Sequence, residues 1–112
     1  MERCEIYSVE YQPSSTIKKQ GTRSDIDKYT KIGYRVTRNS YGNWILQKDA
    51  KVYVKIKNSS GIKTFDMRYD IVIFYSRERI SEALVLNFKQ DIRNGIVSIY
   101  MDENGYYEIK HN

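Results

Sequence analysis

Polar and apolar residues alternate through the middle of the chain, and this pattern predicts β-strands joined by short turns. Runs rich in Val, Ile, Tyr and Thr are bounded there by Gly, Asn, Asp and Ser, which favour turns. We therefore expect a meander of four strands, over residues 34–39, 43–48, 51–57 and 62–75.

Two turns in this meander agree about which side of the strands is buried. If the turns at Asp49-Ala50 and at 58–61 each pair the residues that flank them, one face of the central strand meets the same face of both neighbours. That shared face is predicted to be apolar. Its expected cross-strand partners are Gln47 and Met67 for Val52, and Ile45 and Phe65 for Val54.

A short helix is expected before the meander. Ile26, Tyr29 and Ile32 recur at the spacing of a helical turn. Ser24 can cap the N-terminus of this helix, and Gly33 can end it. A helix of this length depends on tertiary packing for its stability.

A second helix is expected after the meander, from a cap at Ser76 to about Arg93, with a stop at Asn94-Gly95. Residues 82–88 also fit a strand, because several of their side chains are compatible with β-structure. The helix is the favoured interpretation, since four apolar residues repeat at helical spacing: Ile80, Leu84, Phe88 and Ile92.

The two ends of the chain add three more strands. One is expected at residues 3–11, and a hairpin at 96–101 and 106–110 around Asn104-Gly105. The element order β-α-β-β-β-β-α-β-β predicts an α+β fold, with a mainly antiparallel sheet and two helices packed on it. We expect one domain, 1–112, with a flexible basic loop at about 12–23.

Basic residues are concentrated in the centre of the sequence. The net charge is +5, but residues 12–65 contain twelve Lys or Arg and three Asp, whereas residues 1–11 and 96–112 each carry −2. A basic segment of this kind attracts polyanions such as nucleic acid. The high content of Tyr, Ile, Lys and Asn suits translation from an AT-rich bacterial or phage genome.

The favoured candidate site is a sheet face on which lysines alternate with aromatic side chains. In the first predicted hairpin, the face opposite the core presents Trp44 and Leu46 beside Tyr53 and its neighbouring lysines. Ammonium groups neutralise phosphates and rings stack on bases, so this face is expected to bind single-stranded DNA or RNA. The candidate nucleic-acid-binding residues are Lys18, Lys19, Arg23, Arg35, Arg38, Trp44, Lys51, Tyr53, Lys55 and Lys57.

A structural role is the alternative for the same residues. A helix could cover Trp44 and Leu46, since a central sheet can be buried on both faces, and lysines on edge strands prevent aggregation. Asp66, expected opposite Tyr53, would dilute the positive charge. The exposure of Trp44 and Tyr53 distinguishes the two interpretations.

A second aromatic group lies on the closing hairpin. Tyr100, Tyr106 and Tyr107 stand beside acidic residues there and are candidates for binding a protein, because tyrosine is enriched in interface cores. They could instead cover the core of the sheet.

Little in the sequence points to catalysis. Cys4 and His111 lie at opposite ends of the chain and cannot supply a structural zinc site. The scattered carboxylates leave a magnesium site open, but no acidic cluster has a spacing that indicates one, so neither a metal nor a cofactor is expected. Cys4 is expected to be a packing residue, and a penultimate histidine is poorly placed as a general base. The remote enzymatic alternative is a small nuclease that uses Glu108 and Lys110, with Asp91 or Asp102 upstream.

These patterns predict a small non-catalytic module that binds single-stranded nucleic acid or RNA. The alternative is an interaction protein of a phage or plasmid that inhibits or modulates a nucleic-acid enzyme, as anti-restriction and anti-CRISPR proteins do. No apolar stretch is long enough to span a membrane, and the charged start differs from a signal peptide. With its single cysteine, the protein is expected to be cytoplasmic, without a membrane partner.

Overall fold

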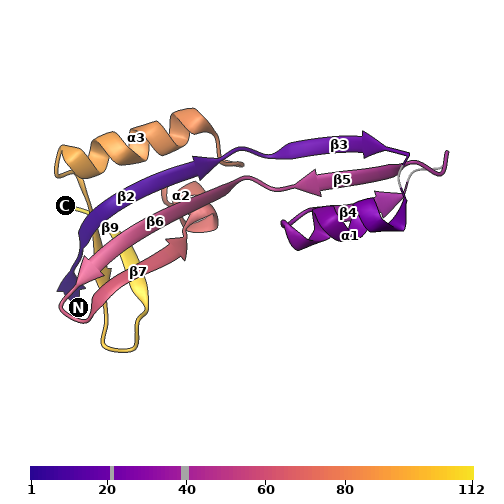
Figure 1. Cartoon of the computed structure of the whole chain (residues 1–112). Coiled ribbons are helices and arrows are strands. Elements are labelled where there is room, and N and C mark those ends of the chain that lie inside the picture. The colour runs from indigo at the N-terminus through magenta and orange to yellow at the C-terminus, as the bar shows by residue number, and fades with distance from the viewer. Residues whose placement is uncertain (21, 39–40) are drawn as a thin grey trace. The chain divides into compact units, whose positions relative to one another are not determined.

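The computed structural model describes residues 1–20, 22–38 and 41–112. These residues form an α+β structure with three helices and three antiparallel sheets of three strands each (Figure 1). The chain divides into two compact units, which we call unit 1 (residues 1–12 and 51–112) and unit 2 (residues 13–50). None of the helices described here has the length and apolar character needed to cross a membrane.

Unit 1 contains two of the sheets and two helices. One sheet has the order β2-β6-β7 and the other has the order β1-β8-β9. The chain passes between the two sheets at Cys4, whose N–H donates to the carbonyl of Ile99 at 2.8 Å. The elements are β1 (Glu2–Arg3), β2 (Glu5–Gln12), β6 (Lys51–Asn58), β7 (Gly61–Asp66), α2 (Arg68–Phe74), α3 (Glu82–Arg93), β8 (Val97–Met101) and β9 (Tyr107–His111).

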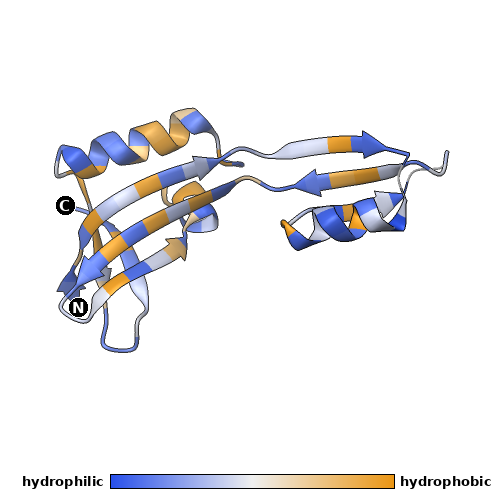
Figure 2. Cartoon of the chain, in the orientation of Figure 1, coloured by the Kyte–Doolittle hydropathy of each residue, from blue (hydrophilic) through white to orange (hydrophobic). Residues whose placement is uncertain are grey.

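The core of unit 1 is built on the alternation along β6, which is visible as alternating colours in Figure 2. Val52, Val54 and Ile56 are completely buried, whereas the residues between them face the other side of the sheet. The predicted apolar face of this strand is therefore confirmed. Buried side chains of the helices and of the second sheet pack in the same cluster, among them Ile71, Val85, Phe88 and Ile99.

Three of the predicted hairpins are confirmed and one is wrong. In unit 2, Arg35–Arg38 pairs with Trp44–Lys48 as the meander predicts. β6 and β7 pair as expected, with Val54 opposite Phe65, and β8 pairs with β9 around Asn104-Gly105. The predicted hairpin at Asp49-Ala50 does not form, because β2 occupies the other edge of β6 and pairs Val9 with Val54. The strand before that turn belongs to unit 2.

The predicted strand over 62–75 is also wrong in its second half, which forms α2 and makes three helices instead of two. The carboxylate of Asp66 accepts a hydrogen bond from the N–H of Arg68 at 3.2 Å, at the point where the chain turns into the helix. Met67 and Ile71, four residues apart, are both completely buried. Burial of this helical face outweighs the β-propensity of the Ile and Val residues.

The helix predicted over the second half of the chain is confirmed as α3, and the strand alternative for 82–88 is wrong. The helix begins later than expected. Its cap is Ser81, whose hydroxyl accepts a hydrogen bond from the N–H of Leu84 at 3.2 Å, and not Ser76. The stop at Asn94-Gly95 is confirmed, since Gly95 has a φ of 73° and donates its N–H to Ile92.

Unit 2 is a three-stranded sheet with one helix. The sheet has the order β3-β5-β4, with β5 in the centre. β3 lies in the segment that was expected to be a basic loop, because Ile17 alternates with polar residues and pairs with Leu46. Gly21 of that loop and Asn39, expected to end a strand, lie outside the described residues. The elements are β3 (Ser15–Lys19), α1 (Arg23–Lys31), β4 (Arg35–Arg38) and β5 (Trp44–Lys48).

The first predicted helix is confirmed as α1, with a different first residue. Its N-cap is Thr22 and not Ser24, and the Thr22 hydroxyl donates to the carboxylate of Asp25 at 3.3 Å. The end at Gly33 is as expected, because this glycine has a φ of 97° and its N–H bonds to the carbonyl of Thr30.

Candidate nucleic-acid interface

The net charge of the protein belongs to unit 2. Residues 13–50 contain eight Lys or Arg and three Asp, a net charge of +5, whereas residues 1–12 and 51–112 contain eleven of each sign. Unit 1 is therefore neutral at pH 7. The long-range electrostatic attraction between this protein and a polyanion therefore comes from unit 2.

The sheet of unit 2 places the protein's single tryptophan between two cations. Trp44 in β5 lies opposite Lys19 in β3 and opposite Arg38 in β4. The next row on the same face, two residues further along each strand, is apolar: Ile17, Leu46 and Val36. A cationic and aromatic row thus adjoins the small hydrophobic core of unit 2.

Helix α1 packs on this same face. The ammonium of Lys19 lies 5.1 Å from the centre of the Tyr29 ring in α1, and Leu46 is only 1% exposed. The alternative that a helix covers this face is therefore confirmed for Leu46, which is a core residue. Trp44, at the end of the strand, is half-buried.

Three cations of unit 2 are held over aromatic rings. Besides Lys19 over Tyr29, the guanidinium of Arg38 lies 5.3 Å from the Trp44 ring and the ammonium of Lys48 lies 5.7 Å from the Tyr34 ring. A ring attracts a cation through its quadrupole but does not neutralise its charge. These cations are thus positioned while they keep their attraction for an anion.

Arg35 differs from these cations. Its guanidinium lies 2.9 Å from the carboxylate of Asp49, in an exposed ion pair that neutralises it. It also lies in the row of Gln47, at the opposite end of β5 from Trp44. The structure therefore separates Arg35 from the tryptophan.

The strand directions bring Lys19 and Arg38 to the same end of the sheet as Trp44. Because β5 runs antiparallel to both neighbours, its start lies beside the C-terminal ends of β3 and β4. Helix α1 begins a few residues after β3 ends. Lys18 lies on the opposite face of β3 from Lys19. We call the following residues the Trp44 end: Lys19, Arg23, Arg38, Tyr41 and Trp44.

Tyr41 and Lys48 were not among the predicted binding residues. Tyr41 is 87% exposed and follows Arg38 closely in the sequence, and an aromatic side chain between Arg38 and Trp44 was the available signal. Lys48 could not be recognised because its ring partner, Tyr34, comes from a distant part of the sequence.

The four predicted residues of β6 do not join this set, since β6 belongs to unit 1. Their face of the β2-β6-β7 sheet is open but carries carboxylates beside the lysines. Glu5 lies opposite Lys57, and the half-buried Tyr53 lies between Glu10 and Asp66. Carboxylates on both sides of the ring repel phosphates. Lys51, Tyr53, Lys55 and Lys57 therefore form a charge-balanced sheet surface.

The three tyrosines of the closing hairpin do not all lie on the same face. Tyr107 packs on Phe65, with ring centres 4.8 Å apart, and its hydroxyl donates to the carboxylate of Asp70. Burial and this carboxylate raise the pKa of the Tyr107 phenol. Tyr100 lies on the other face of the sheet, under the ammonium of Lys110, and Tyr106 is 72% exposed. Tyr107 is thus part of the packed side of the hairpin, whereas Tyr100 and Tyr106 lie on the other face.

The candidate nuclease residues contact one another or nearby groups of unit 1. Glu108 and Lys110 approach each other at 3.7 Å. Asp91 accepts a hydrogen bond from the Tyr75 hydroxyl at 2.6 Å, and Asp102 accepts from the N–H groups of residues 104 and 106 in the hairpin turn. In the described ranges, no three His, Cys, Asp or Glu side chains are grouped as metal ligands.

Cys4 and His111 are used in packing. Cys4 is buried, and desolvation followed by the charge of Glu2 raises the pKa of its thiol, which disfavours the nucleophilic thiolate. The His111 ring stacks on Phe74 at 4.2 Å between ring centres.

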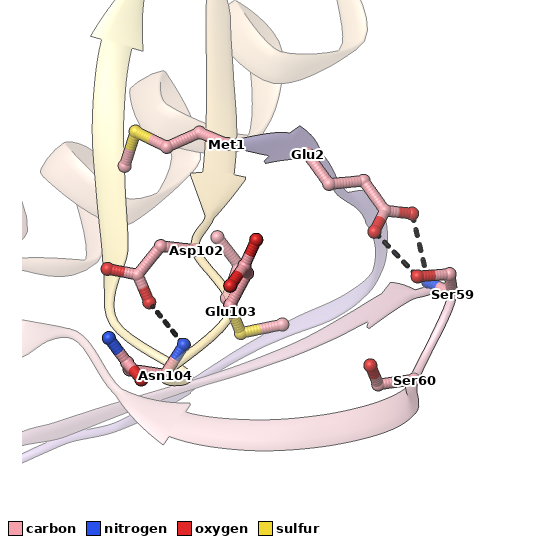
Figure 3. Close-up of a pocket in the computed structure, with 8 residues that line it drawn as sticks. Met1, Glu2, Ser59, Ser60, Asp102, Glu103 and Asn104 are labelled. Carbon is pink, nitrogen blue, oxygen red and sulfur yellow. Dashed lines mark hydrogen bonds between the residues drawn. The ribbon is translucent and has the colours of Figure 1, made fainter.

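A hollow of about 620 Å³ opens between the N-terminus and two turns of unit 1 (Figure 3). Its carboxylates fix the surrounding loops. Glu2 accepts hydrogen bonds from the N–H of Ser59 at 2.9 Å and from its hydroxyl at 2.7 Å, and Asp102 accepts from the N–H of Asn104 (Figure 3). With Glu103 also on its wall, this hollow repels phosphates.

Comparison with known proteins gives no assignment, because neither a family model, nor a curated protein, nor a solved structure matches this chain significantly.

Proposed function

We propose that the protein is a non-catalytic nucleic-acid-binding module, and that it binds single-stranded nucleic acid or RNA through the Trp44 end of unit 2. The observation that carries this proposal is the position of Trp44 between Lys19 and Arg38, in the unit that holds the whole net charge of +5.

Single strands offer two groups at once, a charged backbone and unpaired bases. A tryptophan flanked by cations on both neighbouring strands matches both groups, since the ring stacks on a base while the cations contact phosphates. In a duplex the bases are paired and stacked on one another. The aromatic component therefore favours single strands or RNA loops.

Preorganisation of the cations supports the same function. Lys19 and Arg38 are long side chains that would lose rotamer freedom on binding if they were unrestrained. Their contacts with Tyr29 and Trp44 already restrict them. Part of the entropic cost of binding is then met in the free protein.

A protein that inhibits a nucleic-acid enzyme is the alternative. An inhibitor that occupies the basic nucleic-acid site of an enzyme needs an acidic surface, whereas the charged unit of this protein is basic. Charge complementarity therefore favours nucleic acid itself as the ligand.

The proposal is tested by fluorescence anisotropy with labelled single-stranded RNA and DNA at several salt concentrations. Two double variants serve as a matched pair, because K19A/R38A and K55A/K57A each lower the net charge from +5 to +3. We expect K19A/R38A to weaken binding about tenfold or more and to reduce the salt slope by about 0.7 for each phosphate that the variant no longer neutralises. K55A/K57A should change the affinity less than about twofold.

Equal loss of affinity in the two variants would show that binding follows the overall charge and is not specific to the Trp44 end, which contradicts the proposal. If neither oligonucleotide binds at low salt, the function is wrong. In that case, a protein retained from a bacterial lysate after nuclease treatment would favour the interaction protein.

A further inference from the structure

Strand β9 is an edge strand with backbone groups directed away from its sheet. It pairs with β8, and no second strand among the described residues pairs with its other side. The N–H of Asp102 bonds to the carbonyl of Tyr106, and the N–H of Asn112 bonds to that of Ile96. Because hydrogen-bonded positions alternate in an antiparallel pair, residues 107, 109 and 111 direct their N–H and C=O groups outward.

The sequence of this edge is complementary to itself when it is reversed. If a second copy of β9 pairs antiparallel about Ile109, Ile109 meets Ile109 of the second copy and Tyr107 meets His111 of the second copy. These are the residues whose backbone groups point outward. The pairing therefore forms three backbone-paired positions without a change in β8–β9 register.

The charges of β9 match in the same register. Glu108 then lies opposite Lys110 of the second copy, and Lys110 lies opposite Glu108. Both side chains are about half-exposed, at 52% and 46%, and they are only 3.7 Å apart within one chain. Opposite charges at directly facing positions of an antiparallel pair are stabilising, and like charges there are destabilising. Any register shifted by one residue loses this match.

Apolar surface beside β9 suits the same partner. A small groove of about 240 Å³ lies between α2 and β9 and is lined by Asp70, Ile73, Phe74, Tyr107, Glu108 and Ile109. Ile73 at its border is 57% exposed. A second copy of β9 would extend the sheet over this groove, and its inward side chains, Ile109 above all, would cover Ile73.

We propose that β9 is a homodimer interface, in which two copies of the chain pair antiparallel about Ile109 and form a continuous sheet across a two-fold axis. The interface lies in unit 1 and is independent of the nucleic-acid-binding residues of unit 2.

The test compares charge variants of the intact protein by sedimentation equilibrium across micromolar concentrations. Wild type should show a concentration-dependent monomer–dimer equilibrium. E108K and K110E each place like charges opposite one another at two positions, so each should raise the dimer dissociation constant about tenfold or more. The swapped variant E108K/K110E restores opposite charges across the axis and should return the dissociation constant to within about threefold of wild type.

The restored dimer in the swapped variant separates cross-strand pairing from a general effect of charge. A wild type that remains monomeric throughout would overturn the proposal. The proposal also fails if the swapped variant dissociates as much as the single variants. E108K and K110E change opposite members of the same cross-strand pair. If only one of them folds, that variant alone still tests whether like charges weaken the dimer. Oligonucleotide binding measured on the same samples reports the proposed function separately.

Discussion

The hydroxyl of Tyr107 in β9 donates a hydrogen bond to the carboxylate of Asp70 in α2. A second tyrosine makes the corresponding contact at the other end of this helix, where Tyr75 donates to Asp91 of α3 at 2.6 Å. Helix α2 has only seven residues and has no side-chain N-cap hydrogen bond. A helix this short depends on tertiary contacts. The two tyrosine–aspartate pairs therefore attach α2 to β9 and to α3.

We predict that Tyr107→Phe destabilises the protein by about 1 kcal/mol, because it removes the hydrogen bond and leaves the half-buried Asp70 carboxylate with one partner fewer. Urea denaturation measures this change. Tyr106→Phe is the matched control, since the Tyr106 side chain is 72% exposed and the substitution should change stability by less than about 0.5 kcal/mol. Equal effects of the two substitutions would show that the hydrogen bond to Asp70 contributes nothing.

Stability should fall in alkaline solution. Burial, followed by the hydrogen bond to a carboxylate, raises the pKa of both Tyr75 and Tyr107 above the ordinary value of 10.0. A raised pKa in the folded state means that this contribution to stability is fully present below about pH 10 and is lost as the pH rises above it. Urea denaturation from neutral pH to about pH 11 should show this decline. The decline should be smaller in Y75F/Y107F, and an identical decline would argue against these tyrosines as its source.

The small core of unit 2 should make that unit the more easily unfolded one. Leu46 is its only large hydrophobic side chain that the structure shows as fully buried among the described residues, whereas unit 1 contains a cluster of such side chains. Leu46→Ala is expected to cost about 2–5 kcal/mol, most of it in unit 2. Hydrogen exchange should then show reduced protection in peptides from residues 13–50 and retained protection in α3. Ile71→Ala is the control, with reduced protection in unit 1. A uniform decrease in both variants would contradict separate cores.

The elements that the sequence predicted correctly are those whose signals are local. Asn104-Gly105 and the glycines at positions 33 and 95 fix turns and helix ends through their own backbone freedom, and the structure places positive φ angles at all three glycines. The β6–β7 register followed from a short turn between two alternating runs. Each of these features depends on residues close together in the chain.

The errors in strand pairing concern partners from distant parts of the chain. β4 was expected beside β5, but the alternation along β5 is compatible with any apolar neighbour on its other side. Only the tertiary structure shows that this neighbour is β3 and that β2 is the second partner of β6. Because β5 and β6 do not pair, the residues of the predicted binding face belong to two different sheets. Trp44 stays with Lys19 and Arg38, while Tyr53 lies between Glu10 and Asp66. Charge along the sequence located the basic region, but cross-strand pairing decides which cations keep their charge unbalanced.

Trp44 gives the most direct measurement of the central claim, because it is the single tryptophan of the protein and its fluorescence reports on one position. We expect titration with single-stranded RNA at low salt to quench this emission to saturation, since a stacked base contacts the ring, and added salt should reverse the quenching. The quenching should persist in K55A/K57A and should require far more RNA in K19A/R38A. An emission that is unchanged while anisotropy shows that RNA is bound would contradict the placement of the interface at Trp44.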